Sequence, residues 1–181
     1  ANVDKGETYQ TMSKNPDGDV ITGLEFLTKE LTENYDNLTD STRADYVKMI
    51  VHMVGDMHCP GHIRCPEDPT AGDFYIHLDK DRVRYHSLWD SKIIAAHNPW
   101  GYSDTAELFD TYTKAQIAEV TAGTPYDWGY DSVVATRKVH QVKEGGKFNK
   151  RLYFNEYAPI AQSQICKAGY RLAALLDDIF E

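Results

Sequence analysis

Apolar residues fall at helical spacing through much of this chain. The clearest case is the segment after Val47, whose apolar residues recur at the spacing of one helical face: Ile50, Val51, Val54 and Met57. Met49 and Met53 add a neighbouring apolar stripe. The sequence therefore predicts a helix that is buried on nearly all sides.

Similar patterns and their end signals outline the rest of the fold. The expected helices are residues 22–34, a helix that is capped by Asp40 or Ser41 and ends at Cys59-Pro60-Gly61, and residues 87–97, 103–120, 128–142 and 159–180. Residues 60–72 are rich in Pro and Gly and are expected to form a loop, and residues 74–78 with those around Val83 a short hairpin. The sequence predicts an all-α fold with a small hairpin or loop insertion.

The composition is that of a globular domain that does not hold duplex DNA through its phosphates. The chain has 181 residues, 41% of them hydrophobic, which is enough for one domain with its own core. Its formal net charge is −9, whereas proteins that wrap a duplex use an excess of Lys and Arg to replace counterions. A bound dication would be the exception, since it supplies positive charge that the composition does not show.

The cysteines and the first residue leave the cellular compartment open. Cys59, Cys65 and Cys166 are odd in number, so at most one intrachain disulfide forms and a thiol remains. The longest apolar runs are too short to span a bilayer. The chain begins with Ala1 instead of Met, which suggests a processed or truncated N-terminus.

Two His-x-x-x-Asp pairs are the candidate chemistry. His52 with Asp56, and His86 with Asp90, stand four residues apart, so each pair shares one helical face. His62 lies between the pairs in the sequence. Neutral imidazole and carboxylate are the ligands that catalytic zinc takes, with one position kept open for water.

Burial is the argument for the first pair. An ionised Asp56 in an otherwise apolar helix must be paired, hydrogen-bonded or bound to metal. A plain His–Asp hydrogen bond in the core is the alternative for one pair, but two pairs together with His62 favour a metal. His58 stands beside these ligands and is expected to orient a ligating carboxylate.

Other residues carry weaker hypotheses. A zinc knuckle of Cys59, His62 and Cys65 would lack a fourth ligand at suitable spacing. The remaining candidates are isolated histidines and helical tryptophans, for which packing is the simpler interpretation: His77, His97, His140, Trp89 and Trp128.

At this point the sequence resembles a known family, the S1/P1 zinc-dependent single-strand-specific nucleases. The segments that carry the resemblance are the run His52-x3-Asp56-x-His58-x-Pro60-x-His62, then His86-x2-Trp89-Asp90, Trp128-x2-Asp131-Ser132 and Ala168-Gly169-Tyr170-Arg171-Leu172-Ala173. They span nearly the whole chain. The resemblance implies the mostly helical fold shared by phospholipase C and these nucleases.

The resemblance also implies a site with three zinc ions. His62, His86 and Asp90 would hold one ion, while His52 and Asp56 would hold part of a second, with Asp56 bridging to a third. The implied reaction is hydrolysis of single-stranded DNA or RNA by a metal-activated hydroxide, which leaves 5′-phosphorylated products. The implied location is outside the cytoplasm, periplasmic or secreted.

Departures from the family pattern qualify these expectations. The family's other ligands lie upstream, so residues 1–181 would be the C-terminal bulk of a longer domain, with about one zinc ion fully liganded and with poor cleavage or none by this chain alone. Cys59 and Gly61 replace the usual Gln and Leu. The family's Gly-Gly-Asn loop is here Ala71-Gly72-Asp73, which makes Asp73 the candidate substrate-binding residue.

Two alternatives remain open. A zinc phospholipase C has similar ligands, but it would be expected to expose apolar or basic surface to a membrane. The other alternative is an inactive metal-binding relative or a fragment, and intact-mass analysis of the native protein would reveal any residues before Ala1.

Overall fold

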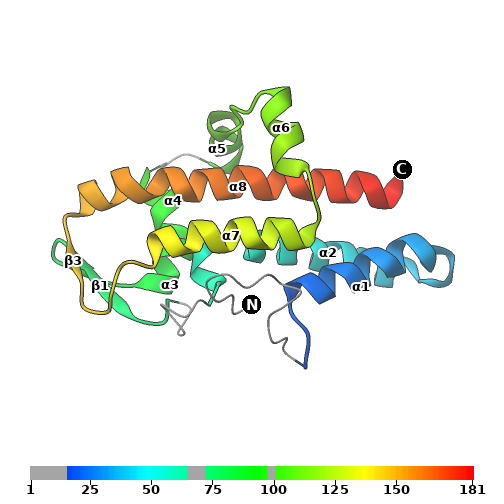
Figure 1. The fold of residues 1–181 in the computed structure, drawn as a ribbon, viewed down its shortest axis with the longest axis horizontal. Coiled ribbons are helices and arrows are strands. Elements are labelled where there is room, and N and C mark those ends of the chain that lie inside the picture. Colours follow the sequence, from blue (N-terminus) through cyan, green and yellow to red (C-terminus); the bar gives the residue numbers. More distant parts are fainter. Residues whose placement is uncertain (1–15, 65–71, 98–100) are drawn as a thin grey trace.

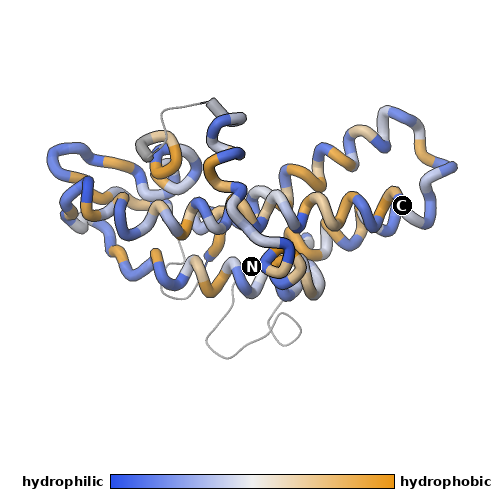
Figure 2. The backbone as a smooth tube through the Cα atoms, turned by 90° about the horizontal axis from the view of Figure 1, so that it is seen from above, coloured by the Kyte–Doolittle hydropathy of each residue, from blue (hydrophilic) through white to orange (hydrophobic). Residues whose placement is uncertain are grey.

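The computed structural model describes residues 16–64, 72–97 and 101–181. The long helix α8 (Lys150–Phe180) runs through the molecule, with α7 (Pro125–Val139) alongside it (Figure 1). Apolar and hydrophilic residues alternate along the helices (Figure 2), as expected for amphipathic elements packed on a shared core. The all-α class with a small hairpin is confirmed.

Two helices form one end of the molecule. They are α1 (Val20–Glu33) and α2 (Asp40–Met57), which are joined by the 3₁₀ turn η1 (Tyr35–Asn37) and contact both each other and α8. The cap of α2 is Thr39, one residue before the expected cap, because its hydroxyl accepts a hydrogen bond from the Thr42 amide.

The prediction that α2 is buried on nearly all sides is wrong. Ile50, Val54 and Met57 are buried in the core, whereas Met49 and Val51 are 46% and 45% exposed. Only one face of α2 lies against α1 and α8, and the apolar residues beyond that face remain at the surface.

The start of α1 offers a test of the local structure. The Asp19 carboxylate accepts hydrogen bonds from the amides of Ile21 and Thr22, each at 3.0 Å, and the Thr22 hydroxyl accepts one from the Asp19 amide. Asp19→Ala is expected to lower the free energy of unfolding by about 1 kcal/mol, because these amides lose their acceptor. Urea denaturation, with the exposed Lys29→Ala on the same helix as the control, checks this; equal midpoints for the two variants would contradict it.

The expected hairpin is confirmed and has a third strand. Strands β1 (Tyr75–Leu78) and β2 (Asp81–Arg84) pair antiparallel, with Ile76 opposite Val83. The strand β3 (Lys147–Phe148) pairs parallel to β1 and was not predicted, since two residues are too short to show an alternating pattern.

The helix after the hairpin begins two residues earlier than expected. It consists of α3 (Tyr85–Ser87), the π-helical turn η3 (Leu88–Lys92) and α4 (Ile93–His97) in direct succession. Tyr85, Leu88 and Ile93 pack into a second apolar cluster with residues of β1 and α8. The predicted stop at Asn98-Pro99 lies outside the described residues.

Other predicted boundaries need correction. The single helix expected over residues 103–120 is two helices, α5 (Tyr102–Phe109) and α6 (Lys114–Thr121), because Thr113 caps a new start. The helix α7 begins at Pro125 instead of residue 128. The helix α8 begins after the Asn149 cap and continues through Pro159, where burial of Ala158 and Ala161 offsets the local cost of proline.

The helix α8 joins the two parts of the core. Its Leu175 and Ile179 pack with α1 and α2, while its Tyr153 and Phe154 pack with the hairpin and α3. Among the described residues, no helix is both long and apolar enough to cross a membrane.

Candidate metal site

The candidate ligands meet where the end of α2 turns onto the helix of residues 85–97. After α2 the chain forms the 3₁₀ turn η2 (Pro60–His62), which contacts α3 and η3. A Cβ atom at Gly61 would lie 3.1 Å from Trp89 Cβ and 3.4 Å from the His86 carbonyl oxygen. Glycine therefore permits this close approach, and the approach brings His62 against Asp90.

Asp90 is the centre of the cluster. Its Oδ1 lies 2.7 Å from His62 Nε2, and its Oδ2 lies 3.2 Å from His86 Nε2. The two imidazole rings are stacked, with centroids 4.9 Å apart and planes 24° apart. Two imidazoles and one carboxylate thus converge, as catalytic zinc sites require.

The first predicted pair extends this cluster into a row. Asp56 Oδ1 lies 3.3 Å from His62 Nδ1, and Asp56 Oδ2 lies 3.4 Å from His52 Nε2. The structure therefore places every predicted ligand in the order His52, Asp56, His62, Asp90 and His86. Binding of a metal by these residues stays a prediction.

The argument that His52 and Asp56 are buried was wrong, although the two side chains do contact each other. The His52 side chain is 75% exposed and that of Asp56 is 44% exposed. His52 lies on the solvent-exposed face of α2, so water solvates its imidazole and no buried partner is required. Its contact with Asp56 places it at the outer end of the row.

A π turn shapes the second pair. The Ile93 amide donates to the Leu88 carbonyl, five residues back, so one extra residue is accommodated around Asp90. The turn leaves Asp90 exposed while Leu88 and Trp89 stay buried. Single π turns within α-helices are frequent at functional sites.

Cys59 also reaches the cluster, which the family pattern did not predict. Its Sγ donates to Asp90 Oδ1 at 3.8 Å, and one ligand atom each of Cys59, His62 and Asp90 lie within 4.8 Å of one another. Burial raises the pKa of the Cys59 thiol to about 12, and the charges of Asp90 and Asp56 act in the same direction. Without a cation the thiol is therefore protonated. Thiolate, imidazole and carboxylate together form a donor set that fits zinc.

Comparison with known proteins assigns the family. The sequence model of the S1/P1 nucleases matches residues 2–181. The chain belongs to the S1/P1 nuclease family. Similar proteins include Endonuclease 2 of Arabidopsis thaliana, 24% identical over an alignment of 172 residues that covers 87% of this chain and 57% of the relative. Endonuclease 4 of the same plant is 22% identical over an alignment of 166 residues that covers 82% of this chain and 55% of the relative. The chain spans about half the length of the curated relatives it matches.

The loop of Gly72 and Asp73, where the S1/P1 pattern suggests a substrate-binding residue, is hydrogen-bonded to the helix that carries His86 and Asp90. The Gly72 carbonyl accepts a hydrogen bond from the His86 amide at 2.9 Å. Gly72 has φ +76°, and a Cβ there would lie 3.0 Å from Tyr85 Cδ1, so any other residue at this position would be strained. Asp73 Oδ1 accepts from two nitrogens of Arg84, at 2.8 and 2.9 Å. Its role in substrate binding stays a prediction.

The expectation for His58 needs correction. His58 is 3% exposed, its Nδ1 lies 2.7 Å from the Val54 carbonyl oxygen, and its Nε2 lies 2.8 Å from Arg171 Nη1. A guanidinium only donates, so Nε2 accepts and Nδ1–H donates to Val54. Burial lowers the pKa of His58 to about 4, which agrees with this neutral tautomer. His58 holds the end of α2 and does not orient a ligating carboxylate.

Arg171 connects the S1/P1 segments that are distant in sequence. It donates to His58, which caps the C-terminus of α2, to Asp131 Oδ2 in α7 at 3.0 Å and to the Val120 carbonyl in α6 at 2.8 Å. Burial raises the pKa of Asp131, but hydrogen bonds and charges from Lys167 and Arg171 outweigh it and hold the pKa below its ordinary value. The segments quoted for the resemblance contain Asp131 and Arg171, but sequence alone assigned them no contact.

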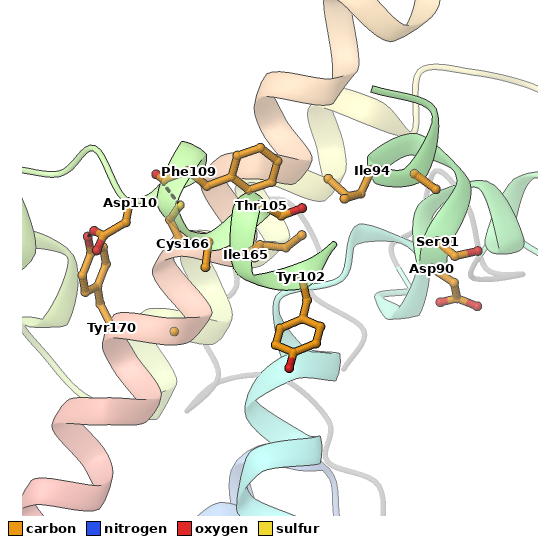
Figure 3. Close-up of a pocket in the computed structure, with 13 residues that line it drawn as sticks. Asp90, Ser91, Ile94, Tyr102, Thr105, Phe109, Asp110, Ile165, Cys166 and Tyr170 are labelled. Carbon is orange, nitrogen blue, oxygen red and sulfur yellow. Dashed lines mark hydrogen bonds between the residues drawn. The ribbon is translucent and has the colours of Figure 1, made fainter. Parts of the chain in front are cut away.

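An apolar pocket of about 750 Å³ opens beside Asp90. Its walls come from α4, α5 and α8 and include Ile94, Phe109 and Ile165. Asp90 lies at one end, and Asp110, which accepts a hydrogen bond from the Tyr170 hydroxyl, lies at the other (Figure 3). The pocket therefore places an apolar surface directly against the candidate metal site.

Proposed function

We propose that the protein is a zinc-dependent phosphodiesterase that hydrolyses single-stranded DNA or RNA to 5′-phosphorylated products. The observation that carries the proposal is the row from His52 to His86, in which Asp90 contacts two imidazoles and Asp56 contacts two. Such a set of donors in a member of a nuclease family favours phosphodiester hydrolysis over a structural role.

The proposal divides the residues of the row between two zinc ions. His62, His86 and Asp90 would hold one zinc ion, and His52 with Asp56 would contribute to a second. Zinc bound there would activate water and stabilise the charge that develops on the phosphoryl oxygens. The shared carboxylates hold the imidazole rings in place, since Asp90 contacts both His62 and His86.

Two pockets along the helix that carries Asp90 suit a single strand. The apolar pocket beside Asp90 offers walls against which an unpaired base can lie. A second pocket, of about 670 Å³, is lined by Lys92 of this helix and by Lys80, Arg82 and Lys150, and it also contains Asp81, which pairs with Lys150. Basic side chains attract the phosphate backbone, which offsets the acidic net charge of the chain.

The test is release of acid-soluble nucleotides from single-stranded DNA and RNA by the protein in its natural length, with zinc and with a chelator. We expect cleavage that the chelator abolishes and zinc restores, with slower cleavage of a duplex of the same sequence. End-labelling of the products identifies 5′-phosphates. Cleavage that is unaffected by the chelator, or no cleavage of either substrate, would contradict the proposal.

We also propose that the protein acts outside the cytoplasm, on the basis of the family resemblance alone. Fractionation of cells that express the natural gene checks this, and recovery of the protein only in the cytoplasmic fraction would contradict it.

A further inference from the structure

The thiol of Cys59 lies inside the candidate metal site. Cys59 stands between Asp56 and His62 in the sequence, and the backbone ties it to both. Its amide donates to the Asp56 carbonyl at 3.1 Å, and its carbonyl accepts from the His62 amide at 3.0 Å. Any motion that moves Cys59 would therefore also move two candidate ligands.

The sulfur packs against the η2 turn. A Cβ atom on Gly61 would lie 3.6 Å from Cys59 Sγ, an ordinary van der Waals distance, so the sulfur lies beside this turn while its hydrogen bond reaches Asp90. Cys166, by contrast, donates to the Phe109 carbonyl at 3.0 Å, in the apolar pocket.

The distance from sulfur to oxygen fits coordination of one ion by both atoms. Zinc binds sulfur at about 2.3 Å and carboxylate oxygen at about 2.0 Å, so two such donors at the tetrahedral angle lie about 3.5 Å apart. Cys59 Sγ and Asp90 Oδ1 are 3.8 Å apart. His62 Nε2 and Asp90 Oδ1, at 2.7 Å, are hydrogen-bonded and would separate by roughly half an ångström to share an ion.

We propose that the Cys59 sulfur is a direct ligand of the metal ion that His62 and Asp90 hold. The thiol proton leaves to solvent as the sulfur–metal bond forms, because a coordinated thiol is deprotonated. A thiolate in the set selects thiophilic dications such as zinc, cobalt and cadmium over magnesium and manganese. The inference rests on the metal site of the proposed function, but not on the reaction catalysed there.

Cobalt(II) is the probe, because a cobalt–thiolate bond gives a sulfur-to-metal charge-transfer band in the near ultraviolet that imidazole and carboxylate ligands do not give. We expect the protein to show this band on cobalt titration, and Cys59→Ala and Cys59→Ser to lose it. Cys166→Ala, whose thiol donates to the Phe109 carbonyl, is the matched control and should retain it. Zinc competition with a chromophoric chelator should show at least about tenfold weaker binding for Cys59→Ala.

The outcomes separate this inference from the proposed function. Visible cobalt absorption without the charge-transfer band, or a band that survives in Cys59→Ala, would overturn the thiolate ligand and leave the site of imidazoles and carboxylates standing. No cobalt or zinc binding at all would overturn both. Circular dichroism of each variant confirms that a lost band does not reflect a lost fold, and Cys59→Ser keeps the side chain nearly equal in size.

Discussion

Asp90→Ala is expected to lower the proposed nuclease activity by more than about 100-fold and to abolish binding of the zinc ion proposed at His62 and His86. Loss of a residue that merely orients a metal ligand costs about 10- to 100-fold in affinity or activity, so loss of a shared ligand should cost more. Asp90 is that shared residue, because its carboxylate contacts both imidazoles. The measurements are zinc content after gel filtration and nucleotide release from single-stranded DNA.

Asp45→Ala provides the matched control for this experiment. Asp45 is an exposed carboxylate on α2 that pairs with Lys48 and lies outside the ligand row. Its substitution should leave both zinc content and nucleotide release unchanged. If Asp90→Ala kept its zinc and turned over like Asp45→Ala, Asp90 would not be a ligand.

The spacing of the candidate ligands could be predicted from the sequence because helical geometry fixes it. Residues four positions apart meet on one helical face, and both His–Asp pairs are indeed in contact. The contact of His62 with both carboxylates is different, since it depends on how η2 lies against the helix of residues 85–97. No local pattern fixes that approach, and the family resemblance supplied it instead.

Burial was predicted less well than spacing. The apolar residues of α2 suggested a fully buried helix, but burial depends on which neighbours cover each face, and Met49 and Val51 have none that cover them fully. The same limit applies to Cys59. Its sequence neighbours suggested a zinc knuckle with His62 and Cys65, and Cys65 lies outside the described residues. The contact of its sulfur with Asp90, a residue far away in sequence, could not be read from this spacing.

The two-residue strand β3, the π turn and the break between α5 and α6 were missed for a related reason. Each is decided by hydrogen bonds over a few residues, which leave little trace in hydrophobic periodicity. The class of the fold did not depend on them, because the amphipathic helices α1, α2, α7 and α8 carry most of the core.

Arg171→Met should produce the largest loss of stability that we expect from a single substitution outside the ligand row. Arg171 is 5% exposed and donates to His58, Asp131 and the Val120 carbonyl, so one side chain joins α2, α6, α7 and α8. Removal of one partner from a buried ion pair costs about 3–5 kcal/mol because the other charge is left uncompensated. Asp131 keeps Lys167 at 2.7 Å and its side chain is 33% exposed, which places the expected loss near the lower end.

A loss of about 3 kcal/mol in the free energy of unfolding corresponds to a decrease in Tm of roughly 6–12 °C for a chain of this size. Thermal and urea unfolding of the metal-free protein measure it, with the exposed Arg151→Met on the same helix as the control. A loss below about 1 kcal/mol would contradict the prediction that this buried ion pair stabilises the fold strongly.

The substitution also removes the donor to His58 Nε2, and His58 stands between Asp56 and Cys59 at the end of α2. Weaker zinc binding by Arg171→Met than by Arg151→Met, measured well below either Tm, would therefore show that this network holds the candidate ligands in position as well as stabilising the fold.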